Sequence, residues 1–559
     1  MKIEKERAPR DAAPSASHKK GDRSAEGSVP FSFRLFSAKD APLWTGERKH
    51  IVVIGSGIEG LAAGSLFAKI GHRVTVLEMN PELIGGHGRW LTFRGMRYSM
   101  GPQYVWEFGP GEQGDRFLKF LGLRDDNPFV LMERDGFERI FIGNRDDEAN
   151  SLFVNFKVPL GLEHFRRDLI AMFPEEADRL DALFRDMIGM FSAYRRFFDE
   201  HSSPEGRIFL ATKFLLTGEA PLSHKLKLGQ SLFLSVREWF DQYGISSLPR
   251  RILYGHGGIF AESESEMSAI AYIIGTGNYH RGARYPLKGF HHFFASMASL
   301  IREHGGSVET GKRVVRLETS NALVTRAVCA DGSAYPCDFV FSDISSRLTY
   351  ALLGMENAHF DYTPSHCIPT ICIGLRKGLG SIALMKGRNY WWQDGAEIDY
   401  DAPDITAPPR MLFVNSPTAN MTADNETHDA DALVVFCAGN YHQEREIHDR
   451  GPEAVAAFKR KLASDIVDIL DRNVFPGLRD HLLFAEVVSS IDIMEQTGGE
   501  LGNAYGRRMN VKEILKGQIE EENSPRNLYN VSATKNTPGI AGGISTAAIL
   551  FEELTGRTI

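Results

Sequence analysis

Cysteine is scarce in this sequence, and basic residues are not in excess. The 559 residues include five cysteines, which are scattered and form no Cys-x-x-Cys pair. This pattern argues against a disulfide framework or a zinc site and is typical of a reducing compartment. The formal net charge is −8, whereas nucleic-acid-binding domains are usually basic. We therefore expect no metal ion and no nucleic-acid partner.

Long apolar runs are also missing. No stretch reaches the roughly 18 consecutive apolar residues of a membrane span. Residues 1–30 are polar, mixed in charge and rich in Ala, Ser and Pro, with no apolar segment typical of a secretory signal. This composition predicts disorder, and we take 1–47 as an N-terminal extension. The expected location is the cytoplasm, with peripheral contact at a membrane as the alternative.

Glycine is abundant, with 54 residues, and the most informative glycines follow the first apolar strand. Residues 51–54 form a β-branched run typical of a strand buried on both faces. The turn Gly55-x-Gly57-x-x-Gly60 comes next, then a helical pattern that Gly71 ends, and then a second strand at 74–77. This order predicts a dinucleotide-binding βαβ unit.

Each residue of this turn has a physical role. Gly55 permits the tight turn, Gly57 lets the backbone approach a pyrophosphate, and Gly60 allows close packing of helix and strand. The helix N-terminus offers free N–H groups to the phosphates. Glu78, 23 residues after Gly55, would bind a ribose diol and repel a 2′-phosphate. The Glu59 side chain is expected to point to solvent.

The residues after Glu78 favour FAD over NAD. A second glycine turn, Gly85-Gly86-His87-Gly88-Arg89, follows the acid closely. Such a turn suits a long, extended dinucleotide, which needs close backbone on several sides. No second Gly-x-Gly-x-x-Gly lies between a strand and a helix, so we expect no separate nicotinamide site.

Residues 150–280 are rich in helical patterns and aromatic side chains. One apolar stripe with steps of three and four residues predicts a helix face packed into the core; its members are Leu180, Phe184, Met187, Phe191, Tyr194 and Phe198. A substrate-lining or membrane-facing stripe is the alternative. Residues 207–236 combine apolar runs with lysines, which fits either a membrane-surface segment or two helices joined at Pro221.

Several segments together resemble a known family. They include GSGIEGLAAGSLFAKIGHRVTVLE, IGGHGRWLTFRGMRYSMGPQ, YPLKGFHHFFASMASLIREHGGSVETGKRVVRLE, ADGSAYPCDFVFSDIS, GNAYG and NLYNVSATKNTPGIAGGISTAAI. From about residue 50 to 559, the sequence resembles the flavin-dependent phytoene desaturase, carotenoid isomerase and retinol saturase group within the flavin amine oxidase superfamily.

This resemblance implies an α/β fold with FAD as the cofactor. It implies a Rossmann-type FAD-binding domain, of the glutathione-reductase and amine-oxidase type, made of residues 48–150, 284–345 and 480–559. A mixed α+β substrate domain would comprise 151–283 and 346–479. The implied cofactor contacts are Gly55, Gly57, Ile58, Glu59, Gly60, Glu78, Met79, Gly85, Gly86, Arg89, Val314, Pro538, Gly539, Gly542, Gly543 and Ile544.

The chain departs from the family pattern at three places. Pro286-Leu287-Lys288-Gly289 replaces Pro-x-Gly-Gly, and Ser532-Ala533 stands where Gly-Asp is frequent. Tyr98-Ser99-Met100-Gly101 lacks the usual Asp before its glycine. The missing acid at Ala533 leaves one ribityl contact unassigned, and together the changes indicate a distant branch.

The implied reaction is hydride or electron transfer at the flavin N5. It would desaturate, saturate or isomerise C–C or C=C bonds of a lipid-like or polyene substrate, with oxygen or a quinone as electron acceptor. The alternatives are a flavin amine oxidase, which forms an imine and hydrogen peroxide, and a non-enzymatic flavoprotein. The candidate catalytic residues are Tyr505 before the last flavin segment, His87 in the second glycine turn, and Lys288.

Overall fold

A parallel five-stranded sheet forms one half of the molecule. The computed structural model describes residues 47–144, 153–200, 221–355, 360–396, 398–420, 430–516, 524–535 and 537–559, so the predicted extension 1–47 lies outside these ranges except for its last residue. The strand order is β19-β13-β1-β2-β9. The bounds are β1 His50–Ile54, β2 Arg73–Leu77, β9 Ser307–Glu309, β13 Phe339–Ser342 and β19 Leu528–Asn530.

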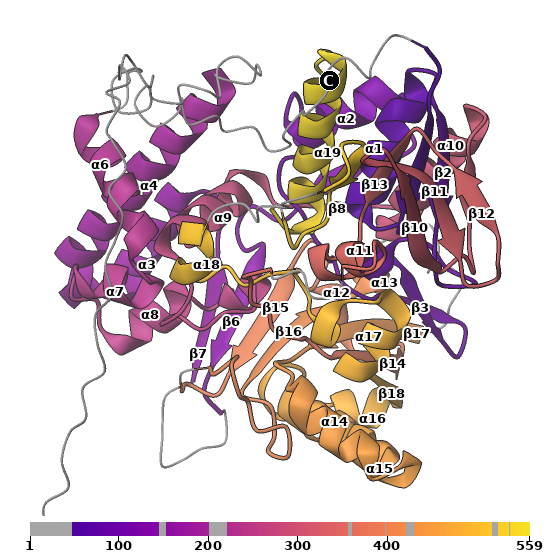
Figure 1. Ribbon diagram of the computed structural model, residues 1–559. Helices are drawn as coiled ribbons and strands as arrows, with labels where there is room; N and C mark the ends of the chain where they lie inside the picture. The colour runs from indigo at the N-terminus through magenta and orange to yellow at the C-terminus, as the bar shows by residue number, and fades with distance from the viewer. Residues whose placement is uncertain are drawn as a thin grey trace, which may run out of the picture.

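Strand β1 is buried on both faces, which explains its continuous apolar sequence. Ile51 and Val53 pack with the helices α1 (Ile58–Lys69), α10 (Gly289–Glu303) and α19 (Gly539–Thr555). Val52 and Ile54 pack with a three-stranded antiparallel sheet; its strands are β10 Val314–Ser320, β11 Leu323–Cys329 and β12 Ala334–Pro336. The predicted βαβ unit is confirmed: its strands β1 and β2 belong to the parallel sheet, and its helix α1 belongs to the helical layer on one face of that sheet (Figure 1).

Helices from opposite ends of the chain meet on this sheet. Phe67 of α1 and Phe551 of α19 lie edge to face, with ring centroids 5.4 Å apart. A Cβ on Gly543 would lie 2.7 Å from Cγ2 of Ile58, so a glycine allows this close approach. The C-terminal helix therefore covers the first helix of the chain.

The second sheet has seven strands in the order β18-β14-β17-β16-β15-β6-β7. All neighbours are antiparallel except β15 and β6. The bounds are β6 Glu138–Ile142, β7 Val154–Val158, β14 Thr370–Arg376, β15 Asn389–Gln393, β16 Met411–Asn415, β17 Ala430–Phe436 and β18 Leu482–Val488.

Two of these strands correct the domain boundaries expected from the sequence. Strands β6 and β18 fall inside the ranges 48–150 and 480–559, which were assigned to the FAD-binding domain, yet both pair with strands of the second sheet. Their partners, β15 and β14, are distant in sequence, and a strand pattern does not reveal its partner.

A helical layer covers one face of the second sheet, on the left of Figure 1. Its helices are α3 Leu162–Met172, α4 Ala177–Glu200, α6 Leu222–Gln230, α7 Val236–Asp241, α8 Ser247–Leu253 and α9 Ala269–Gly282. In α4, the predicted stripe is confirmed as a core face at Leu180, Phe184 and Met187, while the Phe198 side chain lies outside the described part. Helix α6 begins directly after Pro221, and the part of the 207–236 segment before residue 221 also lies outside it.

The remaining elements connect these layers. Their bounds are α2 Gln113–Leu121, α11 Ser346–Ala351, α12 Gly380–Ala383, α13 Pro417–Asn420, α14 Tyr441–Asp449, α15 Pro452–Asn473, α16 Leu478–His481, α17 Ser490–Thr497, α18 Val511–Lys516, β3 Trp90–Phe93, β4 Met96–Ser99, β5 Phe129–Leu131 and β8 Arg284–Pro286. Within the described ranges, no helix has both the length and the apolar composition to span a bilayer.

Candidate active site

A cavity of about 2710 Å³ runs from the parallel sheet to the helical layer. It begins at the carboxyl ends of β1, β2 and β13, where open α/β sheets bind their ligands. It continues between α4, α9 and the inner face of the second sheet. Pockets for one drug-sized ligand measure about 300–1,000 Å³. This cavity therefore has room for a dinucleotide and a second large molecule.

The first glycine turn forms one end of the cavity. Gly55 has a φ of +95°, which favours glycine, and α1 starts three residues later. A Cβ on Gly57 would lie 2.5 Å from Oδ2 of Asp343, and one on Gly60 would lie 2.7 Å from the Gly55 carbonyl oxygen. Larger residues would block both the approach to the α1 N-terminus and the packing behind it.

Glu78 is held in place by the two glycine turns. Its Oε2 accepts hydrogen bonds from the Ser56 amide, at 3.2 Å, and from the Ser56 hydroxyl. Its Oε1 accepts from the Asn80 amide at 2.8 Å. The same Ser56 hydroxyl accepts from the Gly85 amide at 3.0 Å. Ser56 therefore ties the carboxylate and the second glycine turn together.

The second glycine turn presents a cation to the cavity. Gly85 and Gly86 have φ values of +108° and +53°. The Nε of Arg89 donates to the Gly86 carbonyl at 2.9 Å, and Nη2 donates to the Gln496 carbonyl at 2.5 Å. Its Nη1 is buried without a hydrogen-bond partner in the described part of the chain. An unsatisfied buried guanidinium donor fits an anion such as a pyrophosphate.

Most of the predicted cofactor contacts line the cavity. They are Gly55, Gly57, Ile58, Glu59, Glu78, Met79, Gly85, Gly86, Arg89, Val314, Pro538, Gly539 and Gly542. The other three, Gly60, Gly543 and Ile544, are not part of its lining. Gly60 and Gly543 instead allow close backbone packing, and Ile544 is buried between the helices. The expectation that these three residues contact the cofactor therefore stays a prediction without support from the cavity lining.

Glu59 does not point to solvent, which corrects the expectation from the sequence. It is 6% exposed, and its carboxyl lies beside that of Asp343 at the end of β13. Burial raises the pKa of both groups, and the neighbouring Glu59 carboxyl raises the pKa of Asp343 further. Sequence reasoning missed Asp343, although an acid directly after a buried strand end was the available signal.

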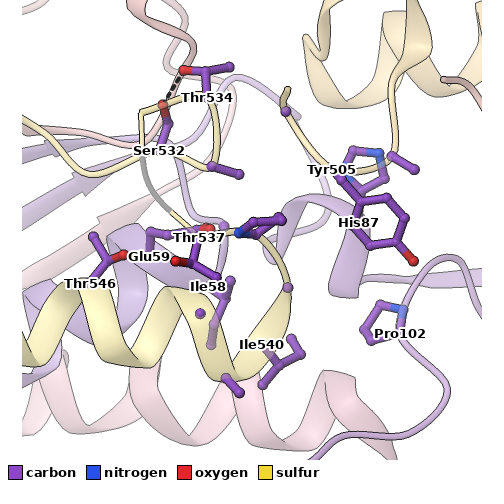
Figure 2. A pocket seen from close by; sticks show the side chains of 18 of the residues that line it. Ile58, Glu59, His87, Pro102, Tyr505, Ser532, Thr534, Thr537, Ile540 and Thr546 are labelled. Carbon is purple, nitrogen blue, oxygen red and sulfur yellow. Dashed lines mark hydrogen bonds between the residues drawn. The ribbon is translucent and has the colours of Figure 1, made fainter. Parts of the chain in front are cut away.

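His87 and Tyr505 lie side by side in the cavity wall (Figure 2). Burial, followed by the nearby charge of Arg89, lowers the pKa of His87 to about 4. Burial raises the pKa of Tyr505 to about 12. The Tyr505 amide donates to the Ser365 hydroxyl at 2.8 Å, which fixes its segment. Both side chains are therefore neutral at pH 7.

Lys288 lies outside the cavity, so its placement does not support a catalytic role. Its Nζ pairs with Oδ1 of Asp126 at 2.5 Å, and its side chain is 36% exposed. His292, on the next turn of α10, bonds the other oxygen of Asp126 at 2.9 Å. Lys288 therefore takes part in a surface ion pair at the start of α10.

Aromatic side chains form the other end of the cavity. Tyr279 lies between Tyr104 and Trp106, with both ring centroids 4.6 Å from its own. Phe413 lies 4.7 Å from Trp391 and 5.3 Å from Phe436, measured between ring centroids. All six side chains line the cavity. This wall, which sequence reasoning missed, suits an apolar or conjugated molecule.

A buried ion pair supports the segment that carries Tyr505. Arg508 donates from Nε to Oε1 of Glu262 at 3.0 Å and from Nη2 to Oε2 at 2.6 Å. Its Nη1 donates to Oδ1 of Asp401 at 2.5 Å. The side chain of Glu262 is fully buried. This bidentate geometry fixes the 499–510 segment against the helical layer.

The comparisons with known proteins agree with this geometry. Residues 53–121 match the model of an NAD(P)-binding Rossmann-like domain. The chain is 25% identical to a phytoene dehydrogenase of Streptomyces griseus over 91% of this chain and 96% of that protein. It is 23% identical to an all-trans-retinol 13,14-reductase of Macaca fascicularis over 94% of this chain and 88% of that protein.

A solved structure shares the fold. Wild-type putrescine oxidase bound to putrescine aligns with a TM-score of 0.58 at 12% identity, over 91% of this chain and 100% of that chain. The curated relatives, the Rossmann-like match and the cavity at the strand ends agree with the resemblance found in the sequence. The chain is therefore a dinucleotide-binding oxidoreductase that is similar over most of its length to phytoene dehydrogenases, carotenoid desaturases and retinol reductases.

Proposed function

We propose that this chain is an FAD-dependent oxidoreductase that desaturates, saturates or isomerises C–C or C=C bonds of a lipid-like or polyene substrate. The observation that carries this proposal is the continuity of the cavity. The glycine turns and the aromatic wall line the same continuous cavity. A dinucleotide at the strand ends can therefore meet an apolar molecule held by the aromatic wall.

In this proposal the described residues hold FAD along the glycine turns. The amides at the α1 N-terminus and Arg89 would bind the pyrophosphate, and Glu78 would accept hydrogen bonds from the ribose diol. The backbone of Val314 would hold the adenine, and the N-terminus of α19 would hold the pyrimidine end of the flavin. When bound, FAD supplies hydride or electron transfer. The protein orients the substrate and excludes water.

Tyr505 and His87 remain the catalytic candidates at the junction of the two parts of the cavity. As neutral groups they would orient the substrate or the flavin by hydrogen bonding. We place the electron acceptor, oxygen or a quinone, outside the chain. The distant relatives named above act, by their names, on phytoene and on all-trans-retinol. Those names support an apolar substrate here.

We further propose a cytoplasmic location with peripheral contact at a membrane, which an exposed apolar rim supports. Leu226, Phe233 and Leu515 are 52%, 64% and 48% exposed. Their neighbours Leu228 and Leu232, together with Leu515 itself, line the cavity. Exposed apolar side chains grouped in this way mark interaction sites for lipids or proteins. We infer that a lipid-like substrate enters the cavity past this rim.

The amine oxidase alternative has less support. Putrescine oxidase is a structural neighbour at 12% identity, which shows a shared fold alone. The lysine that this alternative would use, Lys288, pairs with Asp126 outside the cavity.

The proposed function is tested by anaerobic spectroscopy. Oxidised protein is mixed with an apolar polyene extract and, separately, with a panel of amines, while the absorbance of oxidised flavin is followed. We expect bleaching by the extract alone. Bleaching by an amine alone would contradict the proposal. If neither mixture bleaches the flavin, the protein is reduced beforehand and assayed for saturation or isomerisation of the polyenes.

The buried carboxyls of Glu59 and Asp343 predict pH-dependent dinucleotide affinity. A bound pyrophosphate would raise their pKa values further, so binding takes up protons and affinity falls as the pH rises. We expect the Kd for FAD of deflavinated protein to rise roughly tenfold between pH 6 and pH 8.5. Glu59→Gln should flatten this dependence.

Glu444→Gln is the matched control for this titration. Glu444 is also a buried carboxyl with a raised pKa, but it bonds Ser490 and does not line the cavity. This variant should keep the pH dependence of the unmodified protein. Equal pH profiles for Glu59→Gln and the unmodified protein would contradict the prediction.

A further inference from the structure

We propose that Tyr104, backed by Glu138, moves a proton between the substrate and the protein interior. This inference rests on the proposed function and extends it by naming the group that handles the proton. Desaturation and saturation of a C–C bond each involve one hydride and one proton. The flavin accounts for the hydride, and a group on the protein must account for the proton.

The first observation is the position of Tyr104 at the boundary between cavity and core. Its ring belongs to the aromatic wall, next to Tyr279, and lines the cavity. Its hydroxyl donates a hydrogen bond inward to Oε1 of Glu138. Glu138 does not line the cavity. The phenol therefore connects a substrate in the cavity with a carboxyl group that the substrate cannot reach.

The second observation is that Glu138 is a buried acid with no charged partner among the residues that the structure describes. It is 0% exposed and lies in β6, within the core between the second sheet and the helices. Its Oε2 has no hydrogen-bond partner among the described residues. Burying a carboxyl group in this state is costly. A buried carboxyl group that lies next to a cavity despite this free-energy cost is a candidate for a functional residue.

The groups that face Glu138 are neutral at pH 7. Nδ1 of His256 lies 3.6 Å from its Oε2, and burial lowers the pKa of His256 to about 4. His280, on α9, faces His256, and burial lowers its pKa to about 3. Tyr279, also on α9, has a pKa raised well above 10, chiefly by burial. Burial likewise raises the pKa of Glu138 to about 7. A base with such a pKa is suited to proton transfer near neutral pH.

The proposed step balances in both directions. In desaturation, a hydride passes from one substrate carbon to oxidised flavin, and the neighbouring carbon gives its proton to the Tyr104 oxygen. Tyr104 passes its own hydroxyl proton to the Glu138 carboxylate, and the electron pair of the broken C–H bond becomes the second bond of C=C. The substrate loses two electrons and the flavin gains them. Saturation is the reverse, with a hydride from reduced flavin and the proton from Glu138.

The pH dependence distinguishes the two directions. Glu138 acts as a base only when ionised, so a desaturation rate rises as the pH passes upward through about 7. In saturation it acts as an acid, and the rate falls over the same interval. A pH-independent rate would overturn the inference.

The test compares Tyr104→Phe and Glu138→Gln with the unmodified flavin-loaded protein in single turnover with the polyene that it converts. We expect the rate of the chemical step to fall roughly 100-fold or more in both variants. The apparent dissociation constant of the polyene, taken from the same single-turnover series, should change little, because the Tyr104 ring keeps the shape of the wall and Glu138 does not line the cavity. The change of the rate as the pH passes through about 7 should be absent in Glu138→Gln.

A second readout does not depend on activity. Infrared difference spectra of unmodified protein, titrated across pH 7, should show C=O bands of several buried carboxylic acids, including Glu59 and Glu444. The difference between these spectra and those of Glu138→Gln should isolate one band, that of Glu138, which titrates near pH 7. Tyr400→Phe is the matched control, because Tyr400 is buried outside the cavity and its hydroxyl has no partner among the described residues. It should keep the normal rate.

The outcomes separate this inference from the proposed function. If the unmodified protein converts no polyene, the proposed function fails, whatever the infrared band shows. If it converts a polyene and both variants keep its rate and pH profile, this inference alone fails. Unchanged rates with a titrating Glu138 band would also overturn the inference, since the carboxyl would then titrate without serving the reaction.

Discussion

Gly57→Val is expected to yield protein with almost no bound dinucleotide. The first carbon of the new side chain would lie 2.5 Å from Oδ2 of Asp343 and would fill the space in front of the α1 N-terminus. Gly57 has a φ of −66°, which any residue can adopt, so the backbone itself is not strained. Flavin absorbance per protein after purification should fall below roughly one tenth of full occupancy, because no close backbone approach to the pyrophosphate remains.

Gly380→Val is the control for this loss. Gly380 starts the short helix α12, outside the cavity, and a Cβ there would meet no atom within 4 Å. This variant should keep full flavin occupancy. Full occupancy in Gly57→Val would show that the dinucleotide does not lie at this turn.

Arg508→Leu is expected to cause the largest loss of stability. The substitution leaves the fully buried Glu262 carboxylate without its bidentate partner. Removing one member of a buried ion pair typically costs about 3–5 kcal/mol, because the remaining charge is neither solvated nor paired. The free energy of unfolding, from urea titration of flavin-loaded protein, should fall by about this amount.

The double variant Arg508→Leu with Glu262→Leu shows which of two effects lowers the stability. One is the loss of the attraction between the two side chains, and the other is the burial of an unpaired Glu262 carboxylate. Replacing both partners by apolar residues removes the unpaired carboxylate, so much of the lost stability should return. Arg185→Ala, which breaks an exposed pair with Asp181, should cost no more than about 1 kcal/mol. A double variant as unstable as Arg508→Leu would show that cavity formation, rather than charge burial, dominates.

The features predicted correctly from the sequence are those set by local chemistry. The βαβ unit follows from a buried apolar run, a glycine turn and an amphipathic helix, all within about 30 residues. The position of Glu78 after β2 follows from the same short stretch. The helical face of α4 was recognised because its apolar spacing is a property of one helix.

The features that were missed depend on contacts between distant segments. Asp343 meets Glu59 only because β13 pairs with β1, and Glu138 meets Tyr104 only because β6 joins the second sheet. Lys288 looked like a candidate until Asp126, 162 residues away, appeared as its partner. A single sequence carries no signal for such pairings, so the aromatic wall and its buried acid were visible only in three dimensions.

The packing of α19 on α1 has a consequence for biosynthesis. Until residue 555 has left the ribosome, the face of α1 that Phe551 covers has no partner, and the strand β19 that completes the sheet edge is absent. Nascent chains with such exposed apolar surface depend on chaperones, and contacts this distant in sequence form slowly. Dinucleotide loading is therefore expected to follow synthesis of α19, since this helix contributes a wall of the cavity.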